Sequence, residues 1–204
     1  MQPSSNIIYL ASKSPRRREL LKQIGVRYEL LMIREHAPRI DVDEAPLKDE
    51  TAHAYVQRIV TLKANTAMRL MRERRLTPRP ILTADTTVTL DGHILGKPAD
   101  KADAIRMLTQ LAGESHQVLT AVAVAVNHEI KQVLTTSLVT FAKLSEDEIK
   151  HYVETGEPMD KAGAYAIQGV ASKFIAKLSG SYSGVMGLPL YETAILLRQC
   201  GVQV

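Results

Sequence analysis

An apolar run, Ile7–Ala11, leads through two serines directly into a helix, and this junction constrains the fold more than any other part of the chain. The run predicts a buried strand. Ser14 is a favoured helix N-cap and Pro15 suits the first helical position, so we expect a helix over Pro15–Ile24 with Gly25 at its C′ position. A strand that enters a helix through a short loop is typical of α/β sheets, whose ligands bind beyond the carboxyl ends of the strands.

Two arginines follow at once in the first turn of this predicted helix. Arg16 and Arg17 would add positive charge to a helix end that already carries a partial positive charge. The arrangement becomes favourable if an anion binds there, because backbone N–H groups, the Ser12 and Ser14 hydroxyls and the guanidinium groups would converge on it. The cluster therefore indicates a polyphosphate ligand. The alternative is an arginine cluster that faces only water.

The remaining sequence alternates strands and helices, with prominent hairpins. Strands are expected over Tyr28–Ile33, Ile81–Ala84, Thr87–Leu90, His93–Leu95, Gln117–Val126, Ile130–Phe141 and Lys173–Leu178, and helices over Thr51–Arg75, Asp100–Gly113, Ser145–Gly156 and Pro189–Gln199. Residues 34–50 are expected to be irregular. Asp91-Gly92 is a hairpin-turn signal, and Ser145 with Glu148 forms a capping-box pattern. This mixture predicts an α/β fold with a mixed twisted sheet, flanking helices and a central cleft.

Composition narrows the class of protein. Hydrophobic residues make up 45% and charged residues 24% of the 204 residues, as in globular proteins. No apolar run is long enough to span a bilayer, and Met1–Asn6 lacks the features of a secretory signal, so we expect a cytoplasmic protein with no membrane partner. The single cysteine, Cys200, excludes an internal disulfide. A formal net charge of +4 favours anionic ligands, whereas the aromatic content of 4% argues against nucleic-acid binding.

Three further residues have the chemistry to complete an anion site. Asp85 follows the apolar run Ile81–Ala84, where a carboxylate needs a partner, and it could be a turn cap, an ion-pair partner or a catalytic base. Lys63 lies near the apolar side of the long predicted helix, from which its long side chain could reach solvent. Lys97 precedes Pro98, which restrains its backbone, and could be a phosphate ligand or an ordinary loop lysine.

The chain resembles the Maf family of nucleotide pyrophosphatases in an ordered set of motifs that spans nearly its whole length. The matching segments are Ala11-Ser12-Lys13-Ser14-Pro15-Arg16-Arg17, Lys63-Ala64, Ala84-Asp85-Thr86, Gly96-Lys97-Pro98, Asp160-Lys161-Ala162-Gly163-Ala164-Tyr165, Ile167-Gln168-Gly169 and Gly187-Leu188-Pro189. The resemblance implies a two-lobed α/β architecture related to the inosine triphosphatase fold, formed as a single Maf-like domain over residues 1–204.

The resemblance also implies roles for individual residues. It makes Asp85 the catalytic carboxylate and a metal ligand, and it assigns Glu44 to the same divalent metal, Mg²⁺ or Mn²⁺. Asp43 is the alternative to Glu44, because this acidic segment lies later in the chain than is usual in the family. Lys63 and Lys97 would bind the triphosphate.

Arg16, Thr86 and Gln168 would recognise the nucleobase, because the three occur together in family members that prefer dTTP and UTP. A glutamine amide can donate and accept hydrogen bonds at once, which suits the edge of uracil or thymine. The sequence thus resembles an enzyme that hydrolyses dTTP and UTP, with modified pyrimidine nucleotides as further candidates, to the monophosphate and pyrophosphate. The alternatives are the same chemistry on another base, such as 7-methyl-GTP, or a non-catalytic nucleotide-binding regulator of cell division. A homodimer is one option for assembly.

Overall fold

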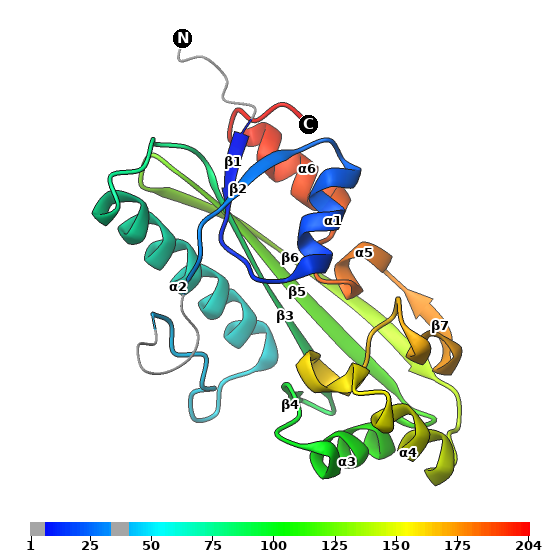
Figure 1. Cartoon of the computed structure of the whole chain (residues 1–204). Coiled ribbons are helices and arrows are strands. Elements are labelled where there is room, and N and C mark those ends of the chain that lie inside the picture. Colours follow the sequence, from blue (N-terminus) through cyan, green and yellow to red (C-terminus); the bar gives the residue numbers. More distant parts are fainter. Residues whose placement is uncertain (1–6, 34–40) are drawn as a thin grey trace.

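The computed structural model describes residues 7–33 and 41–204, and it is built on one mixed sheet flanked by helices (Figure 1). The strands are β1 (Ile7–Leu10), β2 (Arg27–Leu30), β3 (Ile81–Leu90), β4 (His93–Leu95), β5 (Ser115–Val126), β6 (Glu129–Phe141) and β7 (Ile175–Ser179). The α-helices are α1 (Pro15–Gln23), α2 (Ala52–Glu73), α3 (Lys101–Leu111), α4 (Glu146–Glu154), α5 (Tyr182–Val185) and α6 (Leu190–Gln199). The fold class expected from the sequence is confirmed.

The sheet has a parallel part and an antiparallel part that share β3. The strand order is β2-β1-β3-β5-β6-β7, with β1 parallel to both β2 and β3, and with β4 also paired to β3. Strand β1 is short and pairs with β3 only at Ile81 and Leu82, whereas β4 pairs with β3 from Val88 onward. Among the described strands, residues 83–87 of β3 therefore have no neighbour on this edge.

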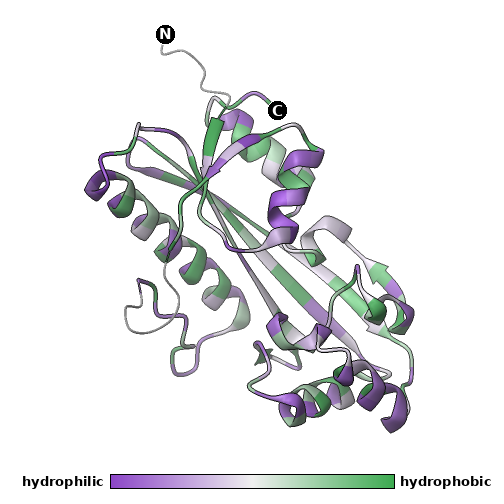
Figure 2. Ribbon diagram, in the orientation of Figure 1, coloured by the Kyte–Doolittle hydropathy of each residue, from purple (hydrophilic) through white to green (hydrophobic). Residues whose placement is uncertain are grey.

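Alternation along the central strands divides the core between the two faces of the sheet. On β5, Ala121 and Ala123 pack in the cluster that α2 covers, whereas Val122 and Val124 pack with residues of α1 and α6 on the other face. Helix α2 turns its apolar side to the sheet and its polar side to solvent, as Figure 2 shows. The same alternation on β3 directs Asp85 toward α2 and Thr86 toward α1.

The long strands β5 and β6 carry the chain beyond this core to a second cluster. There, α3 and α4 pack against the far ends of the sheet through Leu108, Ile149 and Phe141. Figure 1 shows these two helices at the opposite end of the molecule from α1 and α6. The unpaired stretch of β3 lies between the two parts, which explains why a cavity forms there.

Several predicted boundaries were wrong for physical reasons. The sequence predicted an interruption of the strand at Asp85, but β3 continues through it, because Lys63 neutralises the carboxylate and Ala121 on β5 pairs with the residue. The second strand ends at Leu30 and does not reach Ile33. Lys173 belongs to a 3₁₀ turn, so β7 begins at Ile175.

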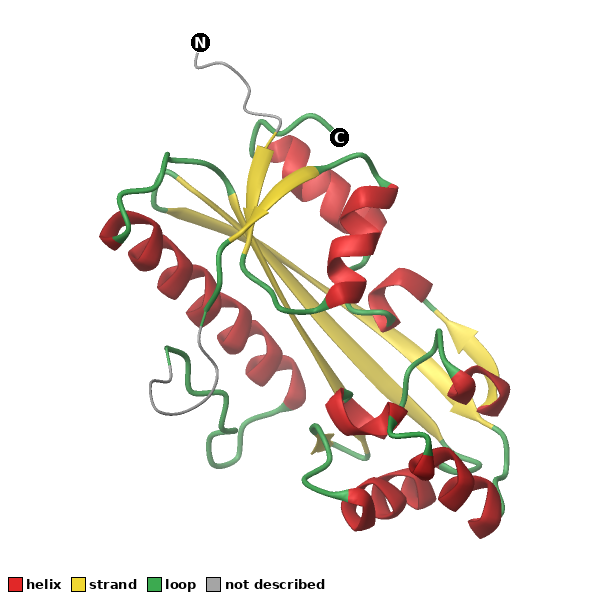
Figure 3. Cartoon of the chain, viewed as in Figure 1, coloured by secondary structure: helices red, strands yellow, loops and turns green. Residues whose placement is uncertain are grey.

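Some expectations concern segments that were missed or are not described. Figure 3 shows the short helix α5 and the 3₁₀ turns that the sequence did not reveal. The irregular chain over residues 41–50 is confirmed. Residues 34–40, and the segment Met1–Asn6 considered as a signal, lie outside the described residues.

Candidate active site

A cavity of about 430 Å³ opens beside the unpaired stretch of β3. Its walls come from the loop after β1, the start of α1, α2, β3, the segment after β4, residues 160–167 and residues 185–187. Nine of the ten sequence-predicted site residues line it: Ser12, Ser14, Arg16, Arg17, Glu44, Lys63, Asp85, Thr86 and Lys97. Segments that lie far apart in the sequence therefore meet at one place, as the ordered motifs predicted.

One wall of the cavity holds a lysine that forms ion pairs with two carboxylates. Lys63 Nζ lies 2.8 Å from Asp85 Oδ1 and 2.8 Å from Glu44 Oε1. Lys63 is 7% exposed, so its side chain does not reach for solvent, which was one of its two expected roles. Burial alone would lower the pKa of Lys63, but the charges of Asp85 and Glu44 outweigh it, and the pKa is raised. The ammonium group therefore stays charged, and the trio keeps one net negative charge.

The geometry distinguishes between the two acidic residues that the sequence left open. Glu44 reaches Lys63 and lines the cavity, whereas the exposed Asp43 accepts a hydrogen bond from Ala45 N at 2.9 Å and stabilises the turn of its own loop. Tyr55, which sequence reasoning missed, donates from its hydroxyl to the Glu44 carbonyl at 3.0 Å. Tyr55 was missed because it lies on the buried face of α2, and residues on such a face are expected only to pack in the core.

The start of α1 contributes cations to the cavity, and hydrogen bonds to neighbouring segments hold Arg17 in place. Arg17 donates from Nε to the Gly187 carbonyl at 2.8 Å, and from its two terminal nitrogens to the hydroxyls of Ser12 and Thr86, each at 3.2 Å. Gly187 has a φ of +114°, which favours glycine, and a Cβ there would come within 3.5 Å of Arg17 Nε. Ser14 is the N-cap residue, as expected, but its side chain makes no capping bond.

The opposite wall carries further charges. Lys97 is exposed at the cavity, and Lys161, which was noticed only as part of a motif, also lines it next to Asp160. Burial on its own would raise the pKa of Asp160. The hydrogen bond from Lys161 and the charges of Lys161 and Arg16 outweigh burial, so the pKa is lowered and Asp160 is ionised. Six lysine or arginine side chains and three carboxylates line the cavity, a formal excess of three positive charges that suits a polyphosphate.

Gln168 is the one predicted site residue that does not line the cavity. Its side chain is exposed, whereas its neighbour Ile167 is 8% exposed and belongs to the wall. The Gln168 loop is held by Glu157, whose carboxylate accepts hydrogen bonds from Tyr152 Oη at 2.8 Å and from Val170 N at 3.0 Å. Gln168 is thus placed at the border of the cavity on an anchored loop.

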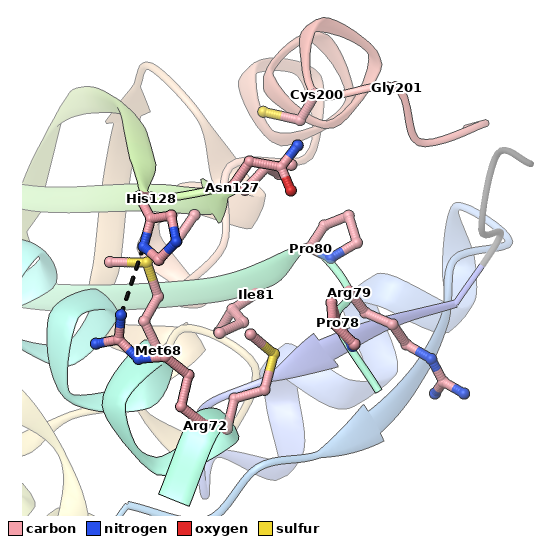
Figure 4. A pocket seen from close by; sticks show the side chains of 13 residues that line it. Met68, Arg72, Pro78, Arg79, Pro80, Ile81, Asn127, His128, Cys200 and Gly201 are labelled. Atoms are coloured by element: carbon pink, nitrogen blue, oxygen red, sulfur yellow. Dashed lines mark hydrogen bonds between the residues drawn. The ribbon is translucent and has the colours of Figure 1, made fainter. Parts of the chain in front are cut away.

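A second cavity, of about 510 Å³, lies near the start of β3 (Figure 4). Its walls include Met68, Ile81 and Cys200, and Arg72 approaches His128 across it at 3.5 Å. None of the sequence-predicted site residues lines this cavity. Its larger volume therefore does not make it the site that the motifs define.

The carboxylates of Glu44 and Asp85 fit a divalent cation that is shared with a substrate. Mg²⁺ is typically held by one or two carboxylates together with phosphate oxygens and water. Within residues 7–33 and 41–204 there is no group of three or more His, Cys, Asp or Glu side chains that could hold a metal ion. The net negative charge of the Lys63 trio supports cation binding.

Comparisons with known proteins define the family. Residues 7–200 match the family described as Maf-like protein. A protein of Aromatoleum aromaticum is 52% identical over 203 residues, with 98% of each chain covered. One of Nitrosomonas europaea is 51% identical over 203 residues, with 99% of this chain and 98% of the relative covered. One of Nitrosospira multiformis is 53% identical over 200 residues, with 98% and 97% covered.

The chain belongs to the Maf family, and the resemblance expected from its motifs is confirmed. Each of these three relatives is named dTTP/UTP pyrophosphatase. In the part of the chain that the structure describes, no helix combines the length and apolar character needed to cross a membrane.

Proposed function

We propose that this protein is a nucleoside triphosphate pyrophosphatase that hydrolyses dTTP and UTP to the monophosphate and pyrophosphate. The observation that carries the proposal is the trio of buried Lys63, buried Asp85 and half-buried Glu44 at the wall of a cavity lined with cations. The names of relatives about 50% identical over almost the full chain support the same reaction and the same bases. Because residues from Ser12 to Gly187 line this cavity, residues 1–204 would act as one unit.

The triphosphate would bind to the cations around the start of α1 and on the opposite wall. Arg17, Lys97 and Lys161 would contact phosphate oxygens, and the partial positive charge at the start of α1 would add to this attraction. Ser12 and Ser14 would donate from their hydroxyls. Since Arg17 is already held by Gly187, Ser12 and Thr86, little side-chain entropy would be lost when the phosphate binds.

The chemical step would be the attack of water on the α-phosphorus. Asp85 would accept a proton from the water as the new P–O bond forms, and the bond to the pyrophosphate oxygen would break. Lys63, held against Asp85, would stabilise the negative charge that accumulates on the phosphate oxygens. A divalent cation, Mg²⁺ or Mn²⁺, held by Asp85 and Glu44 would supply screening of phosphate charge and lower the pKa of bound water.

The nucleobase would lie toward Arg16, Thr86 and the Gln168 loop. Ile167 supplies an apolar surface there, and the Gln168 amide at the border could pair with the O–C–NH edge of uracil or thymine. A uracil or thymine presents two carbonyl oxygens beside one N–H group, so an amide can satisfy both kinds of atom. This is the basis of the proposed preference for dTTP and UTP.

The proposal is tested by the products of a nucleotide panel. The purified protein with Mg²⁺ or Mn²⁺ should release pyrophosphate and the monophosphate from dTTP and UTP, and do so faster than from the purine triphosphates and 7-methyl-GTP. Release of orthophosphate in place of pyrophosphate, or tight binding of nucleotides without turnover, would contradict it. The second of these results would favour a nucleotide-binding regulator.

Two substitutions separate base recognition from phosphate binding. Gln168→Glu should lower kcat/KM for dTTP and UTP by at least about tenfold more than for other nucleotides, because a carboxylate repels a carbonyl oxygen. Lys97→Ala should lower kcat/KM for all triphosphates by similar factors, because every substrate presents the same phosphates. Equal losses on all substrates in Gln168→Glu would make Gln168 a structural residue.

A further inference from the structure

The loop that carries Glu44 has no sheet ladder or helix to hold it in place. Residues 41–50 are irregular and run beside the first turns of α2 (Figure 1). Val42 packs into the core beneath α2, but Ala45 and Leu47 are exposed. Beyond the Val42 anchor, the position of the Glu44 carboxylate at Lys63 depends on specific polar contacts.

Tyr55 makes the first of these contacts. Its hydroxyl donates to the Glu44 carbonyl at 3.0 Å, while the Glu44 side chain reaches Lys63. The hydroxyl therefore acts as a donor to the backbone of the residue whose carboxylate lies beside Lys63.

Arg58, three residues further along α2, makes the second set. Its Nη2 donates to the Ala45 carbonyl at 3.0 Å, and Nε and Nη2 bind the two Glu50 oxygens at 2.6 and 2.7 Å. Glu50 in turn accepts a hydrogen bond from Leu47 N at 3.0 Å. The guanidinium also lies 5.6 Å from the centre of the Tyr55 ring. Arg58 thus ties the middle of the loop, at Ala45, and its C-terminal end, at Glu50, to the helix.

Helix α2 consequently positions Glu44 in two ways: through its carboxylate and through its backbone. Lys63, eight residues and about 12 Å along the helix from Tyr55, attracts the charge of Glu44. Tyr55 holds the backbone carbonyl of Glu44, and Arg58 holds the carbonyl of the next residue, Ala45. Without them, a metal ion would have to order the loop when it binds, and the lost conformational entropy would weaken its affinity.

We propose that Tyr55 and Arg58 are positioning residues that keep Glu44 in place for the divalent cation, so that metal affinity depends on them more than the chemical step does. This inference rests on the proposed function, in which Glu44 and Asp85 hold that cation. Residues that orient metal ligands typically change metal affinity by about 10- to 100-fold when they are replaced.

The test compares Arg58→Met, Arg58→Lys and Tyr55→Phe with Glu44→Gln, and with Arg69→Met as a matched control. Arg69 lies on the same helix and forms an exposed ion pair with Glu73 at 2.9 Å. Mn²⁺ affinity is measured by electron paramagnetic resonance of the free ion, with the α,β-methylene analogue of dTTP bound and a protein-free titration subtracted. The Mn²⁺ concentration for half-maximal dTTP hydrolysis is measured in parallel, and thermal unfolding checks that each variant is folded.

Arg58→Met should weaken Mn²⁺ binding by about tenfold or more. Tyr55→Phe should weaken it several-fold, and Arg58→Lys should lie between the wild type and Arg58→Met, because one ammonium cannot serve both Ala45 and Glu50. At saturating Mn²⁺, kcat should stay within about threefold of the wild type in all three variants. Arg69→Met should change neither quantity.

Two results would overturn the inference, and they have different meanings. If Glu44→Gln weakens Mn²⁺ binding but folded Arg58 and Tyr55 variants do not, the positioning role is wrong while the proposed metal site stands. If Glu44→Gln itself leaves Mn²⁺ binding unchanged, Glu44 is not a ligand, and both the inference and that part of the proposed function fail.

Discussion

Two buried basic side chains, Lys63 and His116, show opposite responses to the same loss of solvent. Lys63 is 7% exposed and meets two carboxylates, so its pKa is raised and it is charged. His116 is 1% exposed, and burial lowers its pKa to about 4, so it is neutral at pH 7. Its Nε2 contacts Tyr165 Oη at 2.8 Å, and its ring packs edge-on against Phe141. The two side chains are buried to a similar degree, and their pKa values differ in direction because only Lys63 has carboxylate partners.

The comparison teaches where charge is kept inside this molecule. Around His116 the neighbours are aromatic rings of the α3–α4 end, which cannot compensate a cation that has lost its water. Around Lys63 the carboxylates come from β3 and from the Glu44 loop, at the wall of the cavity. A buried charge is therefore maintained where a charged ligand is expected, and removed where only packing is needed.

The largest expected effect comes from removing the negative partner that lies on β3. Asp85→Asn keeps the shape of the side chain but removes the proton acceptor and one charge beside Lys63. We expect kcat for dTTP to fall by about 10²–10⁴-fold, the range for loss of a general base. Pyrophosphate release measures the loss, and Asp147→Asn on the exposed start of α4 serves as the control. Turnover close to the wild type would transfer the role to Glu44.

Removing the cation should lower the stability of the fold, in addition to its effect on the chemical step. Lys63→Met leaves Asp85 and Glu44 close together without their shared counter-ion, and we expect the free energy of unfolding at pH 7 to fall by about 3 kcal/mol. Urea denaturation measures the change. Adding Glu44→Gln to this variant should recover part of the loss, because one of the two repelling charges is gone. A loss below about 1 kcal/mol would show that the trio is solvated more than its burial indicates.

The neutral His116 predicts a smaller effect, which is a pH dependence of the free energy of unfolding. The folded-state pKa of His116 is about 4, below its ordinary value of 6.5, so between these values the unfolded chain binds more protons. Stability from this group is therefore complete above pH 6.5 and falls as the pH drops toward 4, by about 3 kcal/mol in total. His116→Gln, which cannot titrate, should lack this part of the acid sensitivity in urea unfolding at pH 7 and pH 4. Identical pH dependence in both proteins would contradict the buried neutral imidazole.

Much of the fold follows from local patterns, and the failures have a common cause. The capping box of Ser145 and Glu148, the N-cap at Asp100 and the Asp91-Gly92 turn are all where the sequence predicted them. Their contacts lie within a few residues, so sequence alone contains them. Strand β3 was wrongly interrupted because the partner of Asp85 lies on another element, 22 residues away.

The candidate site shows the same division. The cations at the start of α1 were found because helix physics makes them unfavourable without an anion. Tyr55 was missed because a tyrosine on an apolar helix face resembles core, and its hydroxyl partner is a backbone carbonyl that no side-chain pattern reports. Gln168 was predicted from resemblance and remains a prediction, since its exposed side chain lies outside the cavity wall.

The contact between Arg17 and Gly187 joins residues 170 positions apart, and it bears on how the protein is made. During synthesis α1 leaves the ribosome long before the carbonyl that orients its arginine has been translated. The nascent chain therefore exposes a cationic helix end while the counterpart from the last part of the sequence is still missing. Contacts of such long sequence separation form late, because closing a long loop costs entropy before any interaction compensates for it. The cavity can be completed only after Gly187 has emerged, so a chain terminated before that residue would have no assembled site.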